Sequence, residues 1–203
     1  DEDFIENVIA VNSHSYLLMF TNTGKVQAKK AYYIPEAGRT AKGQNLVNIL
    51  DLEEDEKITA CISVDAFDDE HYLTMVTRRG VIKRTPLKEY EYQRKGGKIA
   101  LNLDEGDELL FVRCTTGDCE LLIATRNGQA VRFHEENARV MGRTARGVRG
   151  ISLRDGDEVV GVAVIEEGKD LLCVTENGFG KRSPFEDFRL MAHRGGYGVT
   201  CYN

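Results

Sequence analysis

Thr125-Arg126-Asn127-Gly128, preceded by the apolar run Leu121-Leu122-Ile123-Ala124, decides the fold because the chain contains this pattern four times. The other copies of the Thr-x-x-Gly turn lie at 21–24, 77–80 and 175–178, each directly after a short apolar run. The turn glycines recur about every 50 residues, a period typical of solenoids and propellers. We therefore expect four similar units, whose function depends on what each unit presents at its surface.

Each unit contains four short stretches with the composition of β-strands. The expected first strands are 5–11, 58–64, 109–114 and 159–165, and the central strands are 16–20, 72–76, 121–124 and 171–174. The third strands are 25–30, 81–85, 129–133 and 179–183, and the fourth strands are 46–52, 99–103, 150–153 and 198–202. The Asn-Gly pairs in the last two turns favour type I′ hairpins, and Pro35, Pro86 and Pro184 are each expected to start one helical turn.

Four strands per unit, with no helix-length periodic segment, predict an all-β fold. The expected architecture is a propeller-like disc of four-stranded blades, with about four blades in this chain. The repeats are 4–52, 58–103, 109–153 and 159–203, and we expect them to form a single domain over 1–203.

The composition is that of an ordinary soluble protein, with 41% hydrophobic and 30% charged residues and no apolar stretch long enough to span a bilayer. The acidic start lacks Met and a basic segment, which predicts a piece of a longer protein without a signal peptide. The four histidines show no ligand spacing, so no metal is expected. Cys114 and Cys119 flank a predicted turn, where a disulfide is conceivable but a reduced cytosolic pair is favoured.

The distribution of charge is more informative than its total. A net charge of −6 alone argues weakly against a nucleic-acid partner. However, the acidic residues concentrate in the turns between repeats, at 51–56, 104–108 and 155–158, and the third strands and the loops that follow them are basic. Because the pattern recurs with the repeat, we expect a basic rim on a net-negative protein.

The basic loops combine glycine with arginine or lysine, and we call them the rim loops: 38–43, 93–98, 142–150 and 193–198. Glycine lets a backbone approach a phosphate, and Arg or Lys supplies charge and releases counterions. With no recognition helix, contact with the DNA backbone and DNA bending are expected rather than base readout. The candidate DNA-binding residues are Lys29, Lys30, Arg39, Lys42, Arg78, Arg79, Lys83, Arg84, Gln93, Arg94, Lys95, Gly96, Gly97, Lys98, Arg132, Arg143, Arg146, Arg149, Lys181, Arg182 and Arg194.

The loop Gln93-Arg94-Lys95-Gly96-Gly97-Lys98 resembles the "GyrA box" of DNA gyrase, and the spans 16–52, 99–110 and 127–153 look like the C-terminal domain of the gyrase A protein. The resemblance covers essentially the whole chain. It implies a β-pinwheel, in which neighbouring four-stranded blades exchange a strand. It also implies that duplex DNA wraps around the basic perimeter with one handedness, which supports ATP-driven negative supercoiling.

The resemblance also implies where the rest of the machinery lies. The active-site tyrosine belongs to the N-terminal part of the gyrase A protein and the ATPase to the gyrase B protein, so this chain is expected to have no catalytic residue and no cofactor. The holoenzyme would use ATP and Mg²⁺ elsewhere. The implied partners are double-stranded DNA, the remainder of gyrase A, and gyrase B in an A2B2 assembly, with no membrane. The implied location is the bacterial cytoplasm, at the nucleoid.

Two departures from the family pattern refine this expectation. The family's box continues with a further glycine where this chain has Ile99. The functional box belongs to the first of six blades, so we expect it to precede residue 1.

Three alternatives compete with this interpretation. The related domain of topoisomerase IV has a degenerate box and wraps DNA less. A protein-binding propeller like the regulator of chromosome condensation would present aromatic hot spots, yet this chain has no Trp. A propeller enzyme would need convergent carboxylates or a His/Asp constellation from several blades.

Overall fold

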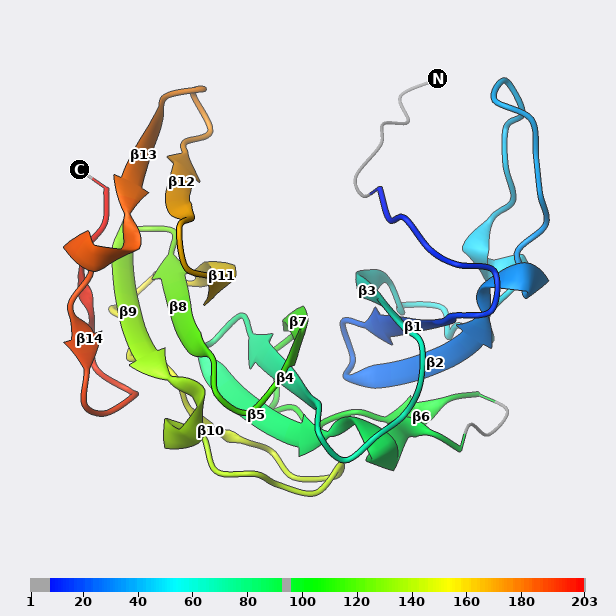
Figure 1. Cartoon of the computed structure of the whole chain (residues 1–203), viewed down its shortest axis with the longest axis horizontal. Coiled ribbons are helices and arrows are strands. Elements are labelled where there is room, and N and C mark those ends of the chain that lie inside the picture. The colour runs from blue at the N-terminus through cyan, green and yellow to red at the C-terminus, as the bar shows by residue number, and fades with distance from the viewer. Residues whose placement is uncertain (1–7, 93–95, 203) are drawn as a thin grey trace.

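The computed structural model describes residues 8–92 and 96–202, and there it forms an arc of β-sheets (Figure 1). Each Thr-x-x-Gly turn joins an antiparallel hairpin, which confirms the expected all-β repeat. The hairpins are β1 (Tyr16–Thr21) with β2 (Lys25–Lys30), β4 (Tyr72–Thr77) with β5 (Val81–Pro86), β8 (Glu120–Thr125) with β9 (Gln129–His134), and β12 (Asp170–Val174) with β13 (Gly180–Pro184). The other strands are β3 (Ile58–Val64), β6 (Lys98–Ile99), β7 (Leu109–Thr115), β10 (Val148–Arg149), β11 (Val159–Ile165), β14 (Leu190–Met191) and β15 (Val199–Thr200).

The larger sheets combine strands from two consecutive repeats. In the first sheet, ordered β3-β1-β2-β6, the hairpin comes from the first repeat, and β3 and β6 come from the second. The second sheet, β10-β5-β4-β7, and the third, β11-β8-β9-β14 with β15 also on β9, follow the same rule. The fourth sheet contains only β12 and β13, because the described chain has no fifth repeat to supply outer strands. The exchange of strands between neighbours that the family resemblance implied is therefore present.

The Thr-x-x-Gly motif has a specific hydrogen-bonding role. In the third turn, the N–H of Gly128 donates to the Thr125 carbonyl at 3.0 Å, and the N–H of Gln129 donates to Thr125 Oγ1 at 3.3 Å. The other three turns repeat both bonds. Within the described chain only glycines have positive φ, so the predicted type I′ turns are wrong. The glycine instead adopts positive φ at the end of a three-residue loop, as in a hairpin with a glycine bulge.

The predicted fourth strands and helical turns are only partly present. The fourth strands predicted at 99–103 and 150–153 shrink to the two-residue strands β6 and β10 and shift toward the N-terminus. The fourth strand predicted at 198–202 becomes β15. Segment 46–52 contains the 3-10 turn η2 (Leu46–Asn48) instead of a strand, because it has no neighbouring hairpin to pair with. Residues 8–11 form no strand, and 5–7 lie outside the described residues.

Single 3-10 turns occupy the connections after the third strands. They are η1 (Ala31–Tyr33), η3 (Leu87–Tyr90), η4 (Glu135–Asn137) and η5 (Phe185–Asp187). Pro86 and Pro184 precede such turns as predicted, whereas residues 35–37 are not helical and η4 has no proline. No helix in the described part of the chain has the length and apolarity needed to cross a membrane.

Gly43, Gly97, Gly147 and Gly198 occupy the same position in the four repeats, and we call them the docking glycines because the last three lie where a rim loop meets the preceding repeat. A Cβ on Gly97 would lie 2.6 Å from the carbonyl oxygen of Val26, and one on Gly147 would lie 2.6 Å from that of Ile82. Gly198 approaches the Ala130 carbonyl still more closely. Gly43, in the first repeat, meets nothing within 4 Å. Each docking glycine has positive φ, so the position requires glycine for its backbone conformation and, in three repeats, for space.

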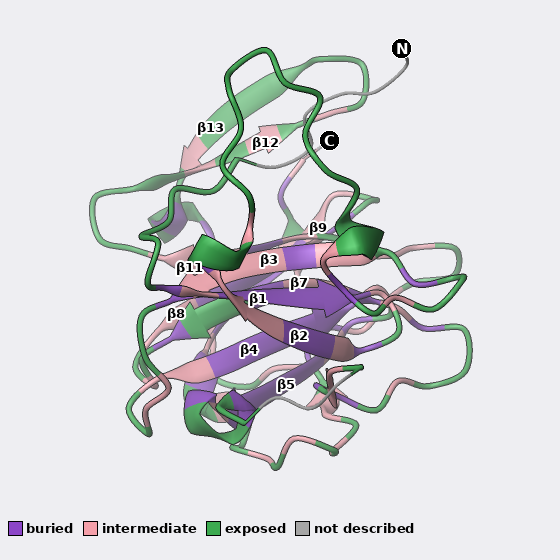
Figure 2. Cartoon of the chain, turned by 90° about the vertical axis from the view of Figure 1, so that its right-hand side faces the viewer, coloured by how far each residue is buried: buried purple, intermediate pink, exposed green. Residues whose placement is uncertain are grey.

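Apolar clusters between neighbouring sheets form the core. One joins Leu18 and Phe20 of β1 to Leu73 and Met75 of β4, and a second joins the other side of β4 to β8 and β9. Burial is concentrated on β1, β4 and β5, whereas the β12–β13 hairpin is largely exposed (Figure 2). The packed sheets form a frame that fixes where the rim loops lie.

Candidate nucleic-acid interface

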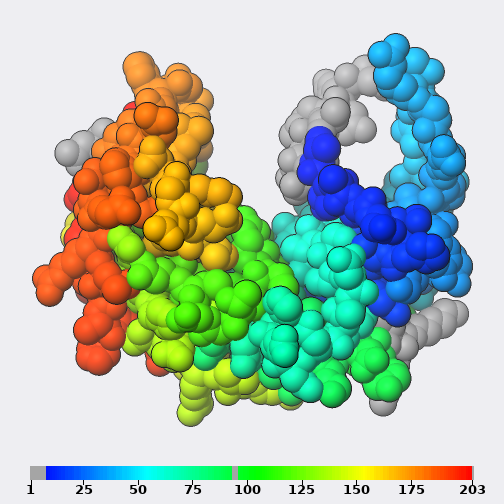
Figure 3. Space-filling model, viewed as in Figure 1, coloured from blue at the N-terminus to red at the C-terminus, as the bar shows by residue number. Residues whose placement is uncertain are grey.

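The rim loops follow the outer edge of the arc. Strands β6, β10 and β14 lie at the periphery, and β3, β7 and β11 line the inner edge (Figure 1). Rim loop 142–150 contains β10 and rim loop 193–198 follows β14, so both lie along the outer side of the arc, which Figure 3 shows as a space-filling view. Whether the four glycine- and arginine-rich loops form one continuous basic edge stays a prediction.

Rim arginines link successive loops through main-chain carbonyls. Arg143 lies four residues before docking glycine Gly147, and its Nη1 donates to the Ile99 carbonyl of the preceding repeat at 2.8 Å. Arg194 holds the same position before Gly198, and its Nη1 donates to the Arg149 carbonyl at 2.6 Å. Both arginines are half-buried, and each therefore uses part of its donor set to connect two repeats.

A polar side chain five residues after the docking glycine holds the next rim loop. Asn102 Nδ2 donates to the Thr144 carbonyl at 2.6 Å, and Ser152 Oγ donates to the Gly195 carbonyl at 2.7 Å. Their main-chain N–H groups bind the same loops, to the carbonyls of Ala145 at 3.3 Å and Gly196 at 2.9 Å. Sequence reasoning missed Asn102 and Ser152, although their constant distance from the docking glycine was a usable signal.

The basic third strands are more buried than expected. Lys83 is 0% exposed, Arg84 is 6% exposed, and the Arg132 side chain is 15% exposed, so placing these three on a solvent-facing rim was wrong. Arg84 Nε donates to the Ala138 carbonyl at 3.1 Å, and Arg132 Nη1 donates to the Phe185 carbonyl at 2.7 Å. Both arginines therefore connect a hairpin to the next repeat. A run of adjacent basic residues on a strand cannot all face solvent, since successive side chains point to opposite faces.

The turn arginines Arg78 and Arg79 form contacts between repeats rather than lying on the rim loops. Arg78 contacts Glu108 at 2.9 Å and Glu158 at 2.8 Å, and Arg126 contacts Glu158 at 3.3 Å. The hydrogen bond and charge of Arg78 lower the pKa of the Glu158 carboxyl. Arg79 Nη1 donates to the Glu105 carbonyl at 3.0 Å. These contacts form a ladder of ion pairs and hydrogen bonds along the inter-repeat turns.

The remaining candidates differ in their surroundings. Arg39 and Lys42 are exposed on a loop that makes few contacts, and Lys181 and Arg182 are exposed on β13, with Arg182 Nε 3.2 Å from Asp170. Lys30 Nζ donates to the His14 carbonyl at 2.6 Å, and Lys29 is half-buried. Gly96 is exposed, Gly97 is a docking glycine, and Lys98 donates to the Glu89 carbonyl at 3.2 Å. Gln93, Arg94 and Lys95 lie outside the described residues.

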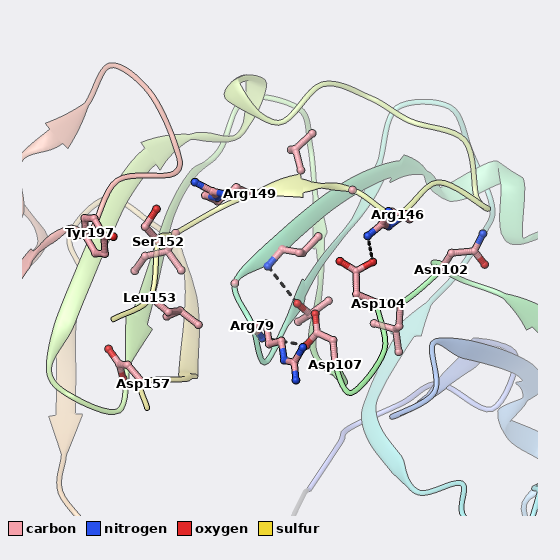
Figure 4. Close-up of a pocket in the computed structure, with 17 residues that line it drawn as sticks. Arg79, Asn102, Asp104, Asp107, Arg146, Arg149, Ser152, Leu153, Asp157 and Tyr197 are labelled. Atoms are coloured by element: carbon pink, nitrogen blue, oxygen red, sulfur yellow. Dashed lines mark hydrogen bonds and ion pairs between the residues drawn. The ribbon is translucent and has the colours of Figure 1, made fainter. Parts of the chain in front are cut away.

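A depression of about 770 Å³ lies where the second and third repeats meet, and Figure 4 shows its mixed charge. Arg146 points across it to Asp104, with which it forms an ion pair. The exposed Arg149 guanidinium makes no hydrogen bond or ion pair with the described residues, so it is available to an anion. Asp107 accepts the main-chain N–H of Arg79 at 3.0 Å.

Side chains that could bind a metal lie apart in the described chain. Across 8–92 and 96–202, no three His, Cys, Asp or Glu side chains gather closely enough to hold a metal ion. All five cysteines are free. Burial, together with the neighbouring Cys173, raises the pKa of the Cys201 thiol to about 11. A binding surface, rather than an enclosed pocket, is what this part of the chain presents.

The fold and rim define a class: an all-β, propeller-like protein with exchanged strands. The family model described as "DNA gyrase C-terminal domain, beta-propeller" matches residues 15–65, 71–116, 120–166 and 169–203. Each matched unit begins at or just before a hairpin, at β1, β4, β8 and β12, rather than at the first strand of our repeats. The chain belongs to this family.

Relatives from bacteria agree with the assignment. The DNA gyrase A protein of Clostridium acetobutylicum is 52% identical over 202 residues, covering 100% of this chain and 24% of the relative. That of Staphylococcus epidermidis is 46% identical, covering 98% and 22%. The chain thus spans about a quarter of the length of these relatives.

Two solved structures share the fold. The C-terminal domain of DNA topoisomerase IV matches with a TM-score of 0.84 and 32% identity, covering 94% of this chain and 59% of that one. The DNA gyrase A C-terminal domain matches with a TM-score of 0.78 and 29% identity, covering 93% and 60%. The topoisomerase IV fold is therefore close, but the higher sequence identity is to the gyrase A proteins. The protein-binding propeller and the propeller enzyme receive no support.

Proposed function

We propose that this chain binds duplex DNA along its rim without sequence preference, bends it, and wraps it with a fixed handedness. The observation that carries the proposal is the position of the rim loops along the outer side of the arc. They combine exposed cations such as Arg39, Lys42 and Arg149 with glycines that let the backbone approach a phosphate. Membership of the gyrase C-terminal domain family supports the same ligand.

The mode of binding follows from what the rim offers. The described loops carry cations and main-chain groups but no helix that could enter a groove, so contacts are to phosphates. Each phosphate neutralised by Arg or Lys releases counterions, so the affinity falls steeply with salt. An arc of successive loops contacts successive phosphates only if the duplex curves around it. Bending energy of the DNA is therefore offset by contacts that the bend permits.

In a whole gyrase this wrap would present a DNA segment for passage through a double-strand break. We infer that the chain works as part of gyrase A, together with gyrase B in an A2B2 assembly, in the bacterial cytoplasm at the nucleoid. Catalysis, ATP hydrolysis and Mg²⁺ binding would belong to the other parts of that enzyme. The chain itself would contribute only a geometric bias to negative supercoiling, without a catalytic residue or cofactor of its own.

The test is ligation of nicked circular DNA in the presence of the chain, followed by separation of the topoisomers after protein removal. Chiral wrapping shifts the distribution toward positive writhe in proportion to the protein bound. Binding without any shift would refute wrapping while leaving DNA binding intact. A shift of the opposite sign would refute the role in negative supercoiling. Competition between unrelated duplexes of equal length tests sequence preference, and a difference of about tenfold or more would contradict backbone binding.

A further inference from the structure

Lys83 is a buried cation that the proposed DNA contacts do not use. It lies on β5 with 0% exposure, and its Nζ donates to the carbonyl of Ala100 at 2.7 Å and to the carbonyl of Arg143. No carboxylate of the described chain lies within ion-pair distance of it. A charge taken out of water without a counter-charge is costly, so its two carbonyl partners must compensate.

The two carbonyls that Lys83 contacts belong to two consecutive repeats. Ala100 follows β6 in the second repeat, and Arg143 lies near the start of the rim loop 142–150 of the third repeat. Lys83 therefore ties the rim loop to the preceding repeat from beneath. The buried Tyr90 hydroxyl supports the same anchor by donating to the Ala100 carbonyl at 3.2 Å.

The rim loop above Lys83 carries three of the candidate DNA-binding arginines. Other contacts also hold its main chain: Glu89 Oε2 accepts the N–H of Arg143 at 3.0 Å, Asn102 donates to the Thr144 carbonyl, and β10 pairs with β5. Lys83 holds the loop from a fully buried position on β5. Removing it would leave the Arg143 carbonyl without this partner in a partly buried position.

The other repeats have different residues at the position of Lys83. The residue three places after the turn glycine is Gln27, Lys83, Val131 or Lys181. Gln27 forms two hydrogen bonds to residue 51, with Nε2 2.7 Å from the Asp51 carbonyl, whereas Val131 is a core residue and Lys181 is exposed. The first repeat thus shows that a neutral amide can anchor a connection from this site.

We propose that Lys83 is a positioning residue of the DNA-binding rim, which fixes the loop 142–150 through the Arg143 carbonyl while contacting no DNA itself. This inference rests on the proposed function. It differs from a purely structural role because the anchor also places a positive charge beneath the loop that meets the phosphates.

The charge gives the anchor a pH dependence. Burial lowers the pKa of Lys83 to about 7, against a partial opposing effect of Glu89, and Arg143 adds repulsion. Among the described residues, Glu89, Arg143 and the buried Tyr90 are the titratable or charged groups next to it. Approaching phosphates favour the protonated form, so DNA binding should take up protons near the pKa of Lys83 and weaken as the pH rises through and above it.

The experiment compares the chain with Lys83→Met and Lys83→Gln, using fluorescence anisotropy with a duplex of about 40 base pairs and hydrogen exchange of the intact chain. Lys83→Met removes both donated hydrogen bonds, so amides of 142–147 should exchange faster and the Kd should rise about threefold to tenfold. Lys83→Gln keeps a donor without a charge, as at Gln27, so the loop should stay protected while the pH dependence of binding is lost. Lys169→Met, an exposed lysine away from the rim, is the matched control and should change neither loop exchange nor Kd.

The outcomes separate this proposal from the proposed function. If the unaltered chain does not bind DNA, the proposed function fails, and loop exchange still shows whether Lys83 positions the loop. If the unaltered chain binds and Lys83→Met matches it in loop exchange and Kd, the positioning role is refuted. Should Lys83→Met fail to fold, the pH profile of Lys83→Gln decides, and a profile identical to that of the unaltered chain overturns the inference. Subtracting the variant profile also removes the contribution of the four histidines.

Discussion

Replacing the docking glycine Gly147 by alanine tests whether the close approach of repeats fixes the rim. The added Cβ would lie 2.6 Å from the Ile82 carbonyl oxygen and 2.9 Å from Val81 Cγ1, so β10 has to move away from β5. This movement disturbs the pairing of Val148 with Ile82 and of Arg149 with Val81. The rim loop 142–150 would lose its register on the preceding repeat.

The magnitude follows from two contributions. Gly147 has a φ of +96°, and a residue with a Cβ at positive φ costs about 1–2 kcal/mol. Loss of two main-chain hydrogen bonds costs roughly 1 kcal/mol each. The free energy of unfolding should therefore fall by about 3–4 kcal/mol, a large part of the roughly 5–15 kcal/mol that is usual for a domain.

Gly43→Ala is the matched control, because Gly43 occupies the same repeat position with a φ of +76° and meets nothing within 4 Å. It should lose only the conformational part, about 1–2 kcal/mol. Urea unfolding followed by tyrosine fluorescence and far-ultraviolet circular dichroism measures both variants, since the chain has no Trp. If the two variants lose stability equally, within about 0.5 kcal/mol, the close approach of repeats does not set the energetics, and the reasoning is refuted.

Three further predictions concern charge. Arg149→Ala removes an exposed guanidinium that has no partner in the described chain. It should lower the magnitude of the slope of log K for duplex binding against log salt concentration by about 1 and leave the unfolding midpoint unchanged. An unchanged slope would contradict phosphate contact by Arg149. Asp104→Asn should free Arg146 and tighten duplex binding about twofold to fivefold at low salt, and weaker binding would show that the ion pair orients Arg146 usefully. Burial alone would raise the pKa of Glu56, but hydrogen bonds from the Glu53 N–H and Thr23, together with Lys25, lower it. The Glu56 carboxylate therefore stabilises the fold fully above the ordinary carboxyl pKa of 4.5, and this stabilisation is lost as the pH falls through the lower native pKa. Thermal unfolding between about pH 6 and pH 3 should therefore be less steeply pH-dependent for Glu56→Gln, and parallel curves would exclude this carboxylate as a contributor.

Local sequence pattern predicted the hairpins well. Apolar runs before Thr-x-x-Gly and the basic runs after it became β1–β2, β4–β5, β8–β9 and β12–β13, with boundaries close to those expected. The outer strands were harder to place, because a two-residue strand such as β6 exists only through pairing with another repeat and has little composition of its own. The exchange of strands could not be read from periodicity, and it came from the family resemblance.

The candidate site was predicted at the level of loops rather than side chains. Charge runs located the rim loops, but β5 is buried on both faces, so the adjacent Lys83 and Arg84 both became internal anchors. Whether an arginine contacts DNA or a carbonyl depends on which neighbour lies within reach. Arg143 reaches the Ile99 carbonyl and the Arg149 guanidinium reaches no partner in the described chain, a difference that composition does not contain.

The contacts between successive rim loops run in one direction along the chain. Each of the last two rim loops is held by the repeat before it: Asn102 holds residue 144, Ser152 holds residue 195, and the rim arginines reach back to carbonyls of the preceding repeat. A loop rich in glycine would otherwise lose much conformational freedom on meeting DNA, and that entropy would weaken binding. Because the preceding repeat already fixes its backbone, the loop would meet the phosphates of a bound duplex in an ordered state under the proposed function. Under the proposed function, strand exchange would therefore serve binding as well as folding, since the same glycine approach that joins two repeats also holds the next set of cations at a fixed spacing.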